Sequence, residues 1–200
     1  MKIRKTLKIL GIISGIGFGL SLNTRGQEEK NNENFSSLLK SNIITNQELV
    51  YKSVKIGSSD LYIKLPFILS PSTVNHPQSN FDKLIKSEVF TFSKDKTFQG
   101  KISYVTYKKD VEFSVEKGTD GGIENIKALP GVEKVIEKRE YFKKNLIEGC
   151  IYDATVYRYG KSFGMKGATL KSGKESWTII ITFLHSKDQH IANNILNSLR

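Results

Sequence analysis

The 200-residue sequence contains few of the residues that form disulfides, metal sites and membrane spans. Its single cysteine, Cys150, excludes an internal disulfide. Its three histidines, His76, His185 and His190, are scattered, and no pair has the spacing that presents two metal ligands on one helix face. The longest apolar run, Ile9–Leu22, has 14 residues, whereas a membrane-spanning helix needs about 20. We therefore expect no metal, no cofactor and no transmembrane segment in the processed chain.

The first 26 residues have the three parts of a secretory signal peptide. A basic start precedes the apolar run, and the small residues Thr24 and Gly26 follow it. We expect cleavage between Gly26 and Gln27. The alternative is an uncleaved anchor, which the four glycines of the apolar run disfavour because glycine weakens a helix. No cysteine follows the run, so a lipid anchor is not expected. The chain is predicted to be exported, either to the periplasm or to the medium or cell surface.

Loss of the signal peptide would change the charge of the protein. The whole chain has 31 Lys and Arg against 20 Asp and Glu, a net charge of +11. Residues 1–26 hold five of the basic residues and no acidic one, so residues 27–200 carry +6. A moderately basic exported chain suits an acidic protein or envelope component, and export argues against nucleic acid as the partner.

Residues 27–47 are polar and rich in Asn and Glu, and the charged segment begins at Gln27. Four apolar residues within this segment have helical spacing, namely Phe35, Leu38, Leu39 and Ile43. The segment is therefore either a short amphipathic helix or a tether that becomes ordered only on contact. We favour a mobile tether with one helical stretch, followed by a single domain at residues 48–200.

The domain is predicted to be mainly β-structure. Alternating apolar residues predict a β-hairpin over 49–65 with its turn at 57–60, followed by a loop over 70–80. Thr119 is expected to open a short helix that ends at Pro130-Gly131. A glycine-punctuated hairpin is predicted over 160–173. The remaining strands are expected near 86–93, 100–108, 111–117, 132–143, 147–159 and 175–184.

The end of the chain has the pattern of a helix that packs on a sheet. Ser186 is a candidate N-cap, and Gln189 has the capping-box spacing from it. The expected apolar stripe consists of Ile191, Ala192, Ile195, Leu196 and Leu199. The preceding strand is apolar on both faces, which predicts a central position in the sheet. The predicted fold class is α+β, a mostly antiparallel twisted sheet with helices on its faces.

Four segments within residues 49–200 have features that recur together in one group of proteins: Leu65-Pro66, Ile147–Tyr152, the Trp-led strand Trp177–Phe183, and the terminal Ile195–Leu199. In these segments and in the order of its elements, the chain resembles the PsbP/DcrB-like superfamily. The resemblance implies an α/β/α sandwich and a non-enzymatic binding or accessory role. This chain lacks the cysteine of a DcrB-like lipoprotein, and nothing in it matches the cofactor-stabilising sites of photosystem subunits.

One segment of the sequence matches a motif of catalytic serines. Gly160-Lys-Ser162-Phe-Gly164 matches G-x-S-x-G, but a nucleophile elbow needs a helix after the serine. The residues that follow Ser162 are rich in glycine and do not favour a helix. We therefore predict no catalytic residue and no enzyme, and a serine hydrolase that uses Ser162 is the least favoured alternative.

The basic residues are concentrated between positions 143 and 174, where seven Lys and Arg face two acidic residues. Aromatic residues are interleaved with them, as in surfaces that bind acidic partners. The candidate partner-binding residues are Tyr157, Arg158, Tyr159, Lys161, Lys166, Lys171 and Lys174. The predicted function is an exported binding or accessory protein of the cell envelope. Two alternatives are a surface adhesin for host matrix or serum proteins, and a solvated hairpin whose lysines only maintain solubility.

Cys150 lies between Gly149 and Ile151 in an apolar, strand-like run. Its expected role is that of a small buried side chain. The alternative is an intermolecular disulfide or a reactive thiol.

Overall fold

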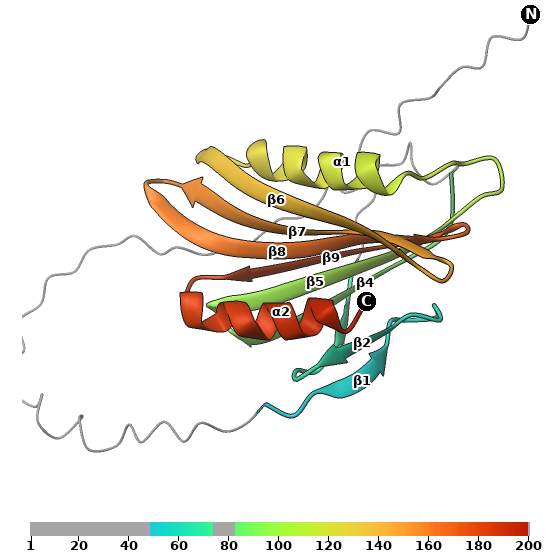
Figure 1. Cartoon of the computed structure of the whole chain (residues 1–200), viewed down its shortest axis with the longest axis horizontal. Helices are drawn as coiled ribbons and strands as arrows, with labels where there is room; N and C mark the ends of the chain where they lie inside the picture. The colour runs from blue at the N-terminus through green and yellow to red at the C-terminus, as the bar shows by residue number, and fades with distance from the viewer. Residues whose placement is uncertain (1–48, 74–82, 200) are drawn as a thin grey trace, which may run out of the picture.

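A computed structural model describes residues 49–73 and 83–199 of the protein (Figure 1). The predicted signal peptide at 1–26, the predicted tether at 27–47 and most of the predicted loop at 70–80 lie outside these residues. The described chain forms a two-stranded sheet, a seven-stranded antiparallel sheet and two α-helices. The α+β class and the mostly antiparallel sheet are thus confirmed.

The predicted first hairpin forms the small sheet. Strands β1 (Lys52–Lys55) and β2 (Tyr62–Leu65) pair antiparallel around a turn that includes Gly57. The Ser59 hydroxyl donates to the Ile56 carbonyl at 2.7 Å and accepts from the Trp177 indole N–H at 3.0 Å. These bonds fix the turn against the core, because all three residues are buried.

The large sheet has its strands in the order β3, β4, β5, β9, β8, β7, β6, with every neighbouring pair antiparallel. Strand β9 occupies the middle position, as its two apolar faces predicted. The strands are β3 (Ser70–Ser72), β4 (Leu84–Asp95), β5 (Phe98–Tyr107), β6 (Val132–Lys144), β7 (Ile147–Arg158), β8 (Lys161–Ser172) and β9 (Glu175–Phe183).

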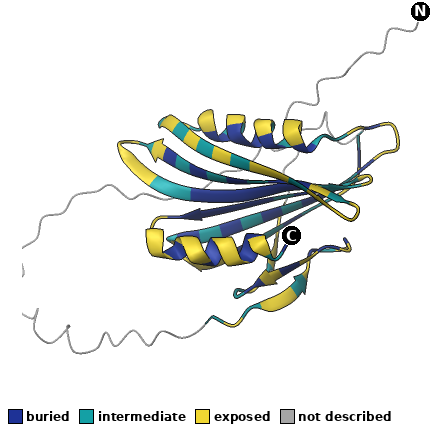
Figure 2. Cartoon of the chain, in the orientation of Figure 1, coloured by how far each residue is buried: buried dark blue, intermediate teal, exposed yellow. Residues whose placement is uncertain are grey.

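The two helices pack on opposite faces of this sheet. Helix α1 (Val115–Lys127) buries Ile123 and Ile126 in a cluster that includes Ile180 of β9. Helix α2 (Gln189–Asn197) lies in the main core, which includes the neighbouring β9 residues Ile179 and Ile181. Successive strand residues point to opposite faces, so β9 contributes to both cores. Figure 2 shows β9 as an almost continuously buried strand.

The apolar stripe predicted for the terminal helix is buried in full. The helix start differs from the prediction, because a 3₁₀ turn, η3 (Ser186–Asp188), precedes it. Asp188 is the N-cap of α2 and makes no side-chain cap bond. Its buried carboxylate instead accepts from the Lys94 ammonium of β4 at 2.9 Å. This contact ties the start of α2 to β4, so Ser186 is not the N-cap.

Two further local predictions are wrong. In place of the strand expected over 111–117, residues 111–114 lead into α1 and residues 115–117 are its first turn. Ser114 is the N-cap, and its hydroxyl accepts from the Lys117 N–H at 3.4 Å. The helix therefore begins four residues before Thr119. The loop expected over 70–80 begins with strand β3, which contains Pro71. Proline is tolerated there because β3 is at the sheet edge, where a backbone donor can be missing.

The glycine-punctuated segment after β7 is the fourth difference. It forms β8, a 12-residue strand between β7 and β9, with six consecutive buried residues from Met165 to Leu170. Two of its glycines leave space for aromatic rings of adjacent strands. A Cβ on Gly164 would lie 2.2 Å from Cε2 of Phe183, and one on Gly167 would lie 2.2 Å from Cζ of Tyr152. Within β8 these two glycines allow close packing of the aromatic rings. The chain turns only at the two ends of this strand.

Candidate functional site

The seven candidate partner-binding residues do not form one surface. Tyr157, Arg158, Tyr159 and Lys161 lie around the turn between β7 and β8, whereas Lys171 and Lys174 flank the turn between β8 and β9. At about 3.3 Å per residue, strand β8 separates Lys161 from Lys171 by roughly 33 Å. The basic residues that are close in sequence are therefore divided between the two ends of one strand.

Lys166, midway along β8, is in the interior. Its side chain is 8% exposed and forms an ion pair with Asp153, the residue directly opposite on β7. Asp153 itself is half-exposed, so the pair has a buried cation and a partly solvated anion. Lys166 links the adjacent strands β7 and β8, and its ammonium does not face solvent.

Two more of the cations make contacts with main-chain carbonyls. The Arg158 guanidinium donates to the Pro130 carbonyl at 2.9 Å and lies 5.3 Å from the ring centroid of Tyr159. The Lys174 ammonium donates to the Val111 carbonyl at 3.0 Å. These contacts place both side chains on neighbouring loops and leave Lys161 as an exposed cation at the β7–β8 turn.

A groove lies beside this turn, on the sheet face that carries α2. Its floor follows one cross-strand row of residues, from Ile136 on β6 through Thr155 and Gly164 to Phe183. Its volume is about 410 Å³. Helix α2 reaches only one side of it, where Gln189 contributes to the lining. The outer strands β6 and β7 therefore form an open part of the sheet.

The open end of this face exposes apolar side chains next to cations. Ile136, Tyr157 and Leu184 have exposed fractions of 47%, 37% and 40%. Lys138 lines the groove directly, and Lys134 is opposite Tyr157 in the β6–β7 register. Two acidic residues line the groove, and both are already paired: Asp153 with Lys166 and Glu137 with Arg139. The groove thus combines a partly apolar floor with basic side chains along β6.

Ser162 lies in the same groove, but its surroundings differ from those of a nucleophile elbow. It is the second residue of β8 and is followed by strand, not by helix. The residues that line the groove include no histidine. His190, on α2, directs its Nδ1 to the Lys187 carbonyl.

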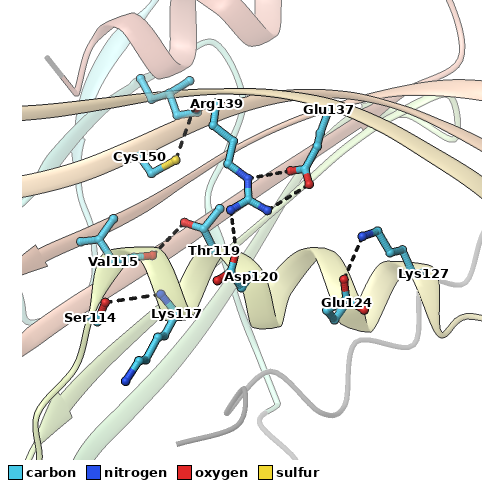
Figure 3. A network of polar contacts seen from close by, with 11 residues as sticks. Ser114, Val115, Lys117, Thr119, Asp120, Glu124, Lys127, Glu137, Arg139 and Cys150 are labelled. Carbon is cyan, nitrogen blue, oxygen red and sulfur yellow. Dashed lines mark hydrogen bonds and ion pairs between the residues drawn. The ribbon is translucent and has the colours of Figure 1, made fainter.

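The opposite face of the sheet holds Cys150 beneath α1. The thiol is buried, and desolvation by this burial raises its pKa. Figure 3 shows the polar contacts beside it, where Arg139 of β6 donates to both carboxylate oxygens of Glu137 at 2.9 Å and to Asp120 of α1 at 2.5 Å. Across residues 49–73 and 83–199, no group of three or more His, Cys, Asp or Glu could hold a metal ion.

Sequence reasoning missed the contribution of β6 to the groove. Ile136 lies between Lys134 and Lys138 on one face of a predicted strand, which is the one local signal that it could have provided. The contributions of Leu184 and Gln189 depend on where α2 begins, and the sequence did not predict that position. None of the described helices is long and apolar enough to span a membrane.

Comparisons with known proteins give limited information about this site. No protein-family model matches the chain, and no curated protein matches it. Among solved structures, the chain is similar to PA94, a protein of unknown function from Pseudomonas aeruginosa. The identity is 14% and the TM-score is 0.39, with 72% of this chain and 89% of PA94 covered.

Proposed function

We propose that the chain is an exported, non-enzymatic binding or accessory protein of the cell envelope that binds an acidic partner. The observation that carries the proposal is the groove beside α2, which has a partly apolar floor and exposed lysines on β6. A segment that presents apolar side chains together with carboxylates would match both properties. The binding surface consists of Lys134, Ile136, Lys138 and Tyr157.

Both the apolar and the basic side chains of this surface would favour binding of an acidic partner. Ile136, Tyr157 and Leu184 are apolar side chains that remain in contact with water in the free protein. Their burial by a partner would be favourable by about 25 cal/mol for each Å² of apolar surface removed from water. Lysines near the groove would attract an acidic partner and exclude basic ones, because exposed charges chiefly determine association rate and specificity.

The cellular location within this proposal depends on residues 1–26, whose pattern is that of a signal peptide. The relationship to known proteins is likewise an inference: we propose that the domain is an α/β/α sandwich of the PsbP/DcrB-like type. Helices on opposite faces of an antiparallel sheet support this assignment. Accessory and binding roles among the members of that superfamily agree with the proposed function.

The test is affinity capture from envelope extract of the source cells, with residues 27–200 as bait and mass spectrometry to identify the bound proteins. The test variant changes Lys134 and Lys138 together to Glu. The matched control changes Lys109 and Lys117 to Glu, because these lysines are also exposed and give the same change in net charge away from the groove.

We expect the wild type and the control to retain the same acidic protein, and the test variant to lose it. Raising the salt concentration should weaken capture by the wild type, because screening reduces interactions between exposed charges. If all three baits retain the same proteins, the groove is not the binding surface. If the control loses the partner as completely as the test variant, only net charge matters and the proposal is wrong.

A further inference from the structure

The chain itself contains a segment whose chemistry matches the groove beside α2. Residues 27–48, the acidic segment, lie outside the described residues. They hold four acidic and two basic residues, a net charge of −2, whereas residues 49–200 carry +8. The acidic segment therefore has the opposite charge to the domain that follows it, and the lysines beside the groove would attract it.

The apolar residues of the acidic segment have the spacing of one helix face, namely Phe35, Leu38, Leu39 and Ile43. In a helix, Phe35 and Ile43 would be about 12 Å apart along the axis. The groove crosses the sheet from β9 through β8 and β7 to β6. Three steps between neighbouring strands amount to roughly 14 Å. The apolar stripe thus has nearly the same length as the groove floor.

The described chain begins beside α2, on the same side of the large sheet as the groove (Figure 1). Leu49 packs against the main core, and the Tyr51 hydroxyl accepts a hydrogen bond from the Asn194 side-chain amide of α2 at 3.4 Å. Gln189, which lines the groove, is five residues from Asn194, about 7.5 Å along the helix. The eight residues from Ile43 to Tyr51 can span roughly 26 Å. The stripe can therefore reach the groove.

We propose that the acidic segment docks in the groove of its own chain, with its apolar stripe on the floor and its carboxylates at β6. The inference rests on the proposed function, because it gives the same groove a competitor within the chain. Ile43 is nearest the point of attachment, so it lies beside α2, and Phe35 lies toward β6. Docking covers side chains that are otherwise exposed to water, namely Ile136, Tyr157 and Leu184.

This direction also brings opposite charges together. Glu28, Glu29 and Glu33 precede the stripe, so they extend past Phe35 to the outer strand. Lys134 and Lys138 flank Ile136 on the groove face of β6, and neither forms an ion pair with another described residue. The reverse direction would leave both lysines uncovered.

Attachment within one chain makes weak contacts sufficient for docking. A short linker gives an effective concentration on the order of mM, so a docking affinity in that range fills the groove about half of the time. A segment that is docked roughly nine-tenths of the time weakens partner binding about tenfold. The acidic segment therefore excludes partners whose affinity is too low to displace it.

The experiment is NMR spectroscopy of purified, isotope-labelled residues 27–200 with a nitroxide spin label on Lys40→Cys. Position 40 lies outside the stripe, and the native Cys150 is buried. An unpaired electron broadens the amide signals of nearby residues, so we expect Ile136 and Leu184 to lose intensity. Gly173 should be unaffected, because it follows β8 at the end far from the groove, roughly 30 Å from Gly164.

Leu39→Ser is the test variant and removes the centre of the stripe. Ile44→Ser is the matched control, because Ile44 would lie on the opposite face of a helix. Loss of a buried leucine should reduce the docking constant at least about tenfold. The signals of Ile136 and Leu184 should therefore recover in Leu39→Ser and stay broadened in Ile44→Ser.

The charge contribution is tested in the same labelled protein. Lys134→Glu with Lys138→Glu should restore the signals of the groove, whereas Lys109→Glu with Lys117→Glu should leave them broadened. A mixture of isotope-labelled protein without nitroxide and unlabelled protein with nitroxide should show no broadening. Broadening in this mixture would mean that the segment of a second copy occupies the groove, and would overturn the proposal.

Groove signals that stay sharp in the spin-labelled wild type also overturn the proposal, as does equal broadening in Leu39→Ser and Ile44→Ser. Capture from envelope extract then separates the two proposals. Leu39→Ser should retain more of the acidic partner than the wild type does. If the segment docks but no bait retains a partner, the proposed function is wrong and docking stands. If a partner is retained but the signals stay sharp, only docking is wrong.

Discussion

The aromatic ring of Tyr152 lies over Gly167, the residue directly opposite it on the adjacent strand. A Cβ atom at Gly167 would be 2.2 Å from both Cζ and the hydroxyl oxygen of Tyr152, well inside van der Waals contact. Tyr152 is 2% exposed, so its ring has little free space into which to move. The absence of a side chain at Gly167 is therefore a packing requirement of the core beneath α1.

This relationship predicts that Gly167→Ala is destabilising. Overpacking of a filled core costs about 1–3 kcal/mol, which urea denaturation followed by circular dichroism would measure. The control is a double-mutant cycle with Tyr152→Leu, whose shorter side chain should tolerate the added methyl group. If Gly167→Ala costs the same in the Tyr152→Leu background as in the wild type, contact with the ring is not the cause.

The hydroxyl of Tyr152 supplies a second prediction. Among the described residues, it has no hydrogen-bond partner and is buried. An unpaired buried polar group costs about 1–3 kcal/mol, so Tyr152→Phe should raise the free energy of unfolding by about 1 kcal/mol at neutral pH. A decrease of that size would instead indicate a hydrogen bond to water.

The same substitution should alter the stability at alkaline pH. Burial raises the pKa of Tyr152 above its ordinary value of 10.0. The unfolded chain therefore loses this proton first, and stability that is fully present below about pH 10 declines as the pH rises toward the folded pKa. Unfolding of the wild type and Tyr152→Phe should be compared between about pH 8 and pH 11. The advantage of the variant should grow above about pH 10, and an advantage independent of pH would contradict the assignment.

Cys150 is predicted to be unreactive in the folded protein. The side chain is buried, and desolvation raises its pKa, so the nucleophilic thiolate is scarce at neutral pH. Its reaction with a coloured disulfide reagent at about pH 8 should be slow in buffer and complete in denaturant. Equal rates in the two conditions would favour the reactive thiol that the sequence left open.

Much of the fold could be predicted from local periodicity. The first hairpin, the central position of β9 and the buried stripe of α2 all follow from apolar residues at strand or helix spacing. Each of these patterns is complete within a short segment. The secondary structure that it predicts therefore depends little on which other segment packs against it.

Strand β8 could not be predicted in this way, because its glycines leave room for side chains that other strands contribute. Gly164 accommodates Phe183, and Gly167 accommodates Tyr152. Locally, glycines at this spacing indicate turns. The predicted basic surface was wrong for a related reason. Its residues are close in sequence but lie at opposite ends of the extended strand β8. The groove depends on how far α2 extends over the sheet, which no local pattern specifies.

The ion pair between Lys166 and Asp153 leads to an asymmetric prediction. The lysine side chain is 8% exposed and the aspartate side chain 46%. Asp153→Ala would leave a buried ammonium without its partner, and breaking a buried pair in this way costs about 3–5 kcal/mol. Because water can reach the position of Asp153, we expect a loss of about 3 kcal/mol, at the lower end of that range. Lys166→Met would leave a half-exposed carboxylate that water can solvate, so the loss should be below about 1 kcal/mol.

Thermal and urea unfolding of the two variants would measure this difference, and Lys171→Met would be the control for loss of another lysine from the same strand. Equal losses from Asp153→Ala and Lys166→Met would mean that the ammonium reaches solvent.

The Lys166 variant also separates a structural role from a role in partner binding. Because the ammonium of Lys166 is enclosed between β7 and the core, Lys166→Met should capture the acidic partner as well as the wild type does, whereas Lys138→Met on the exposed edge should weaken capture.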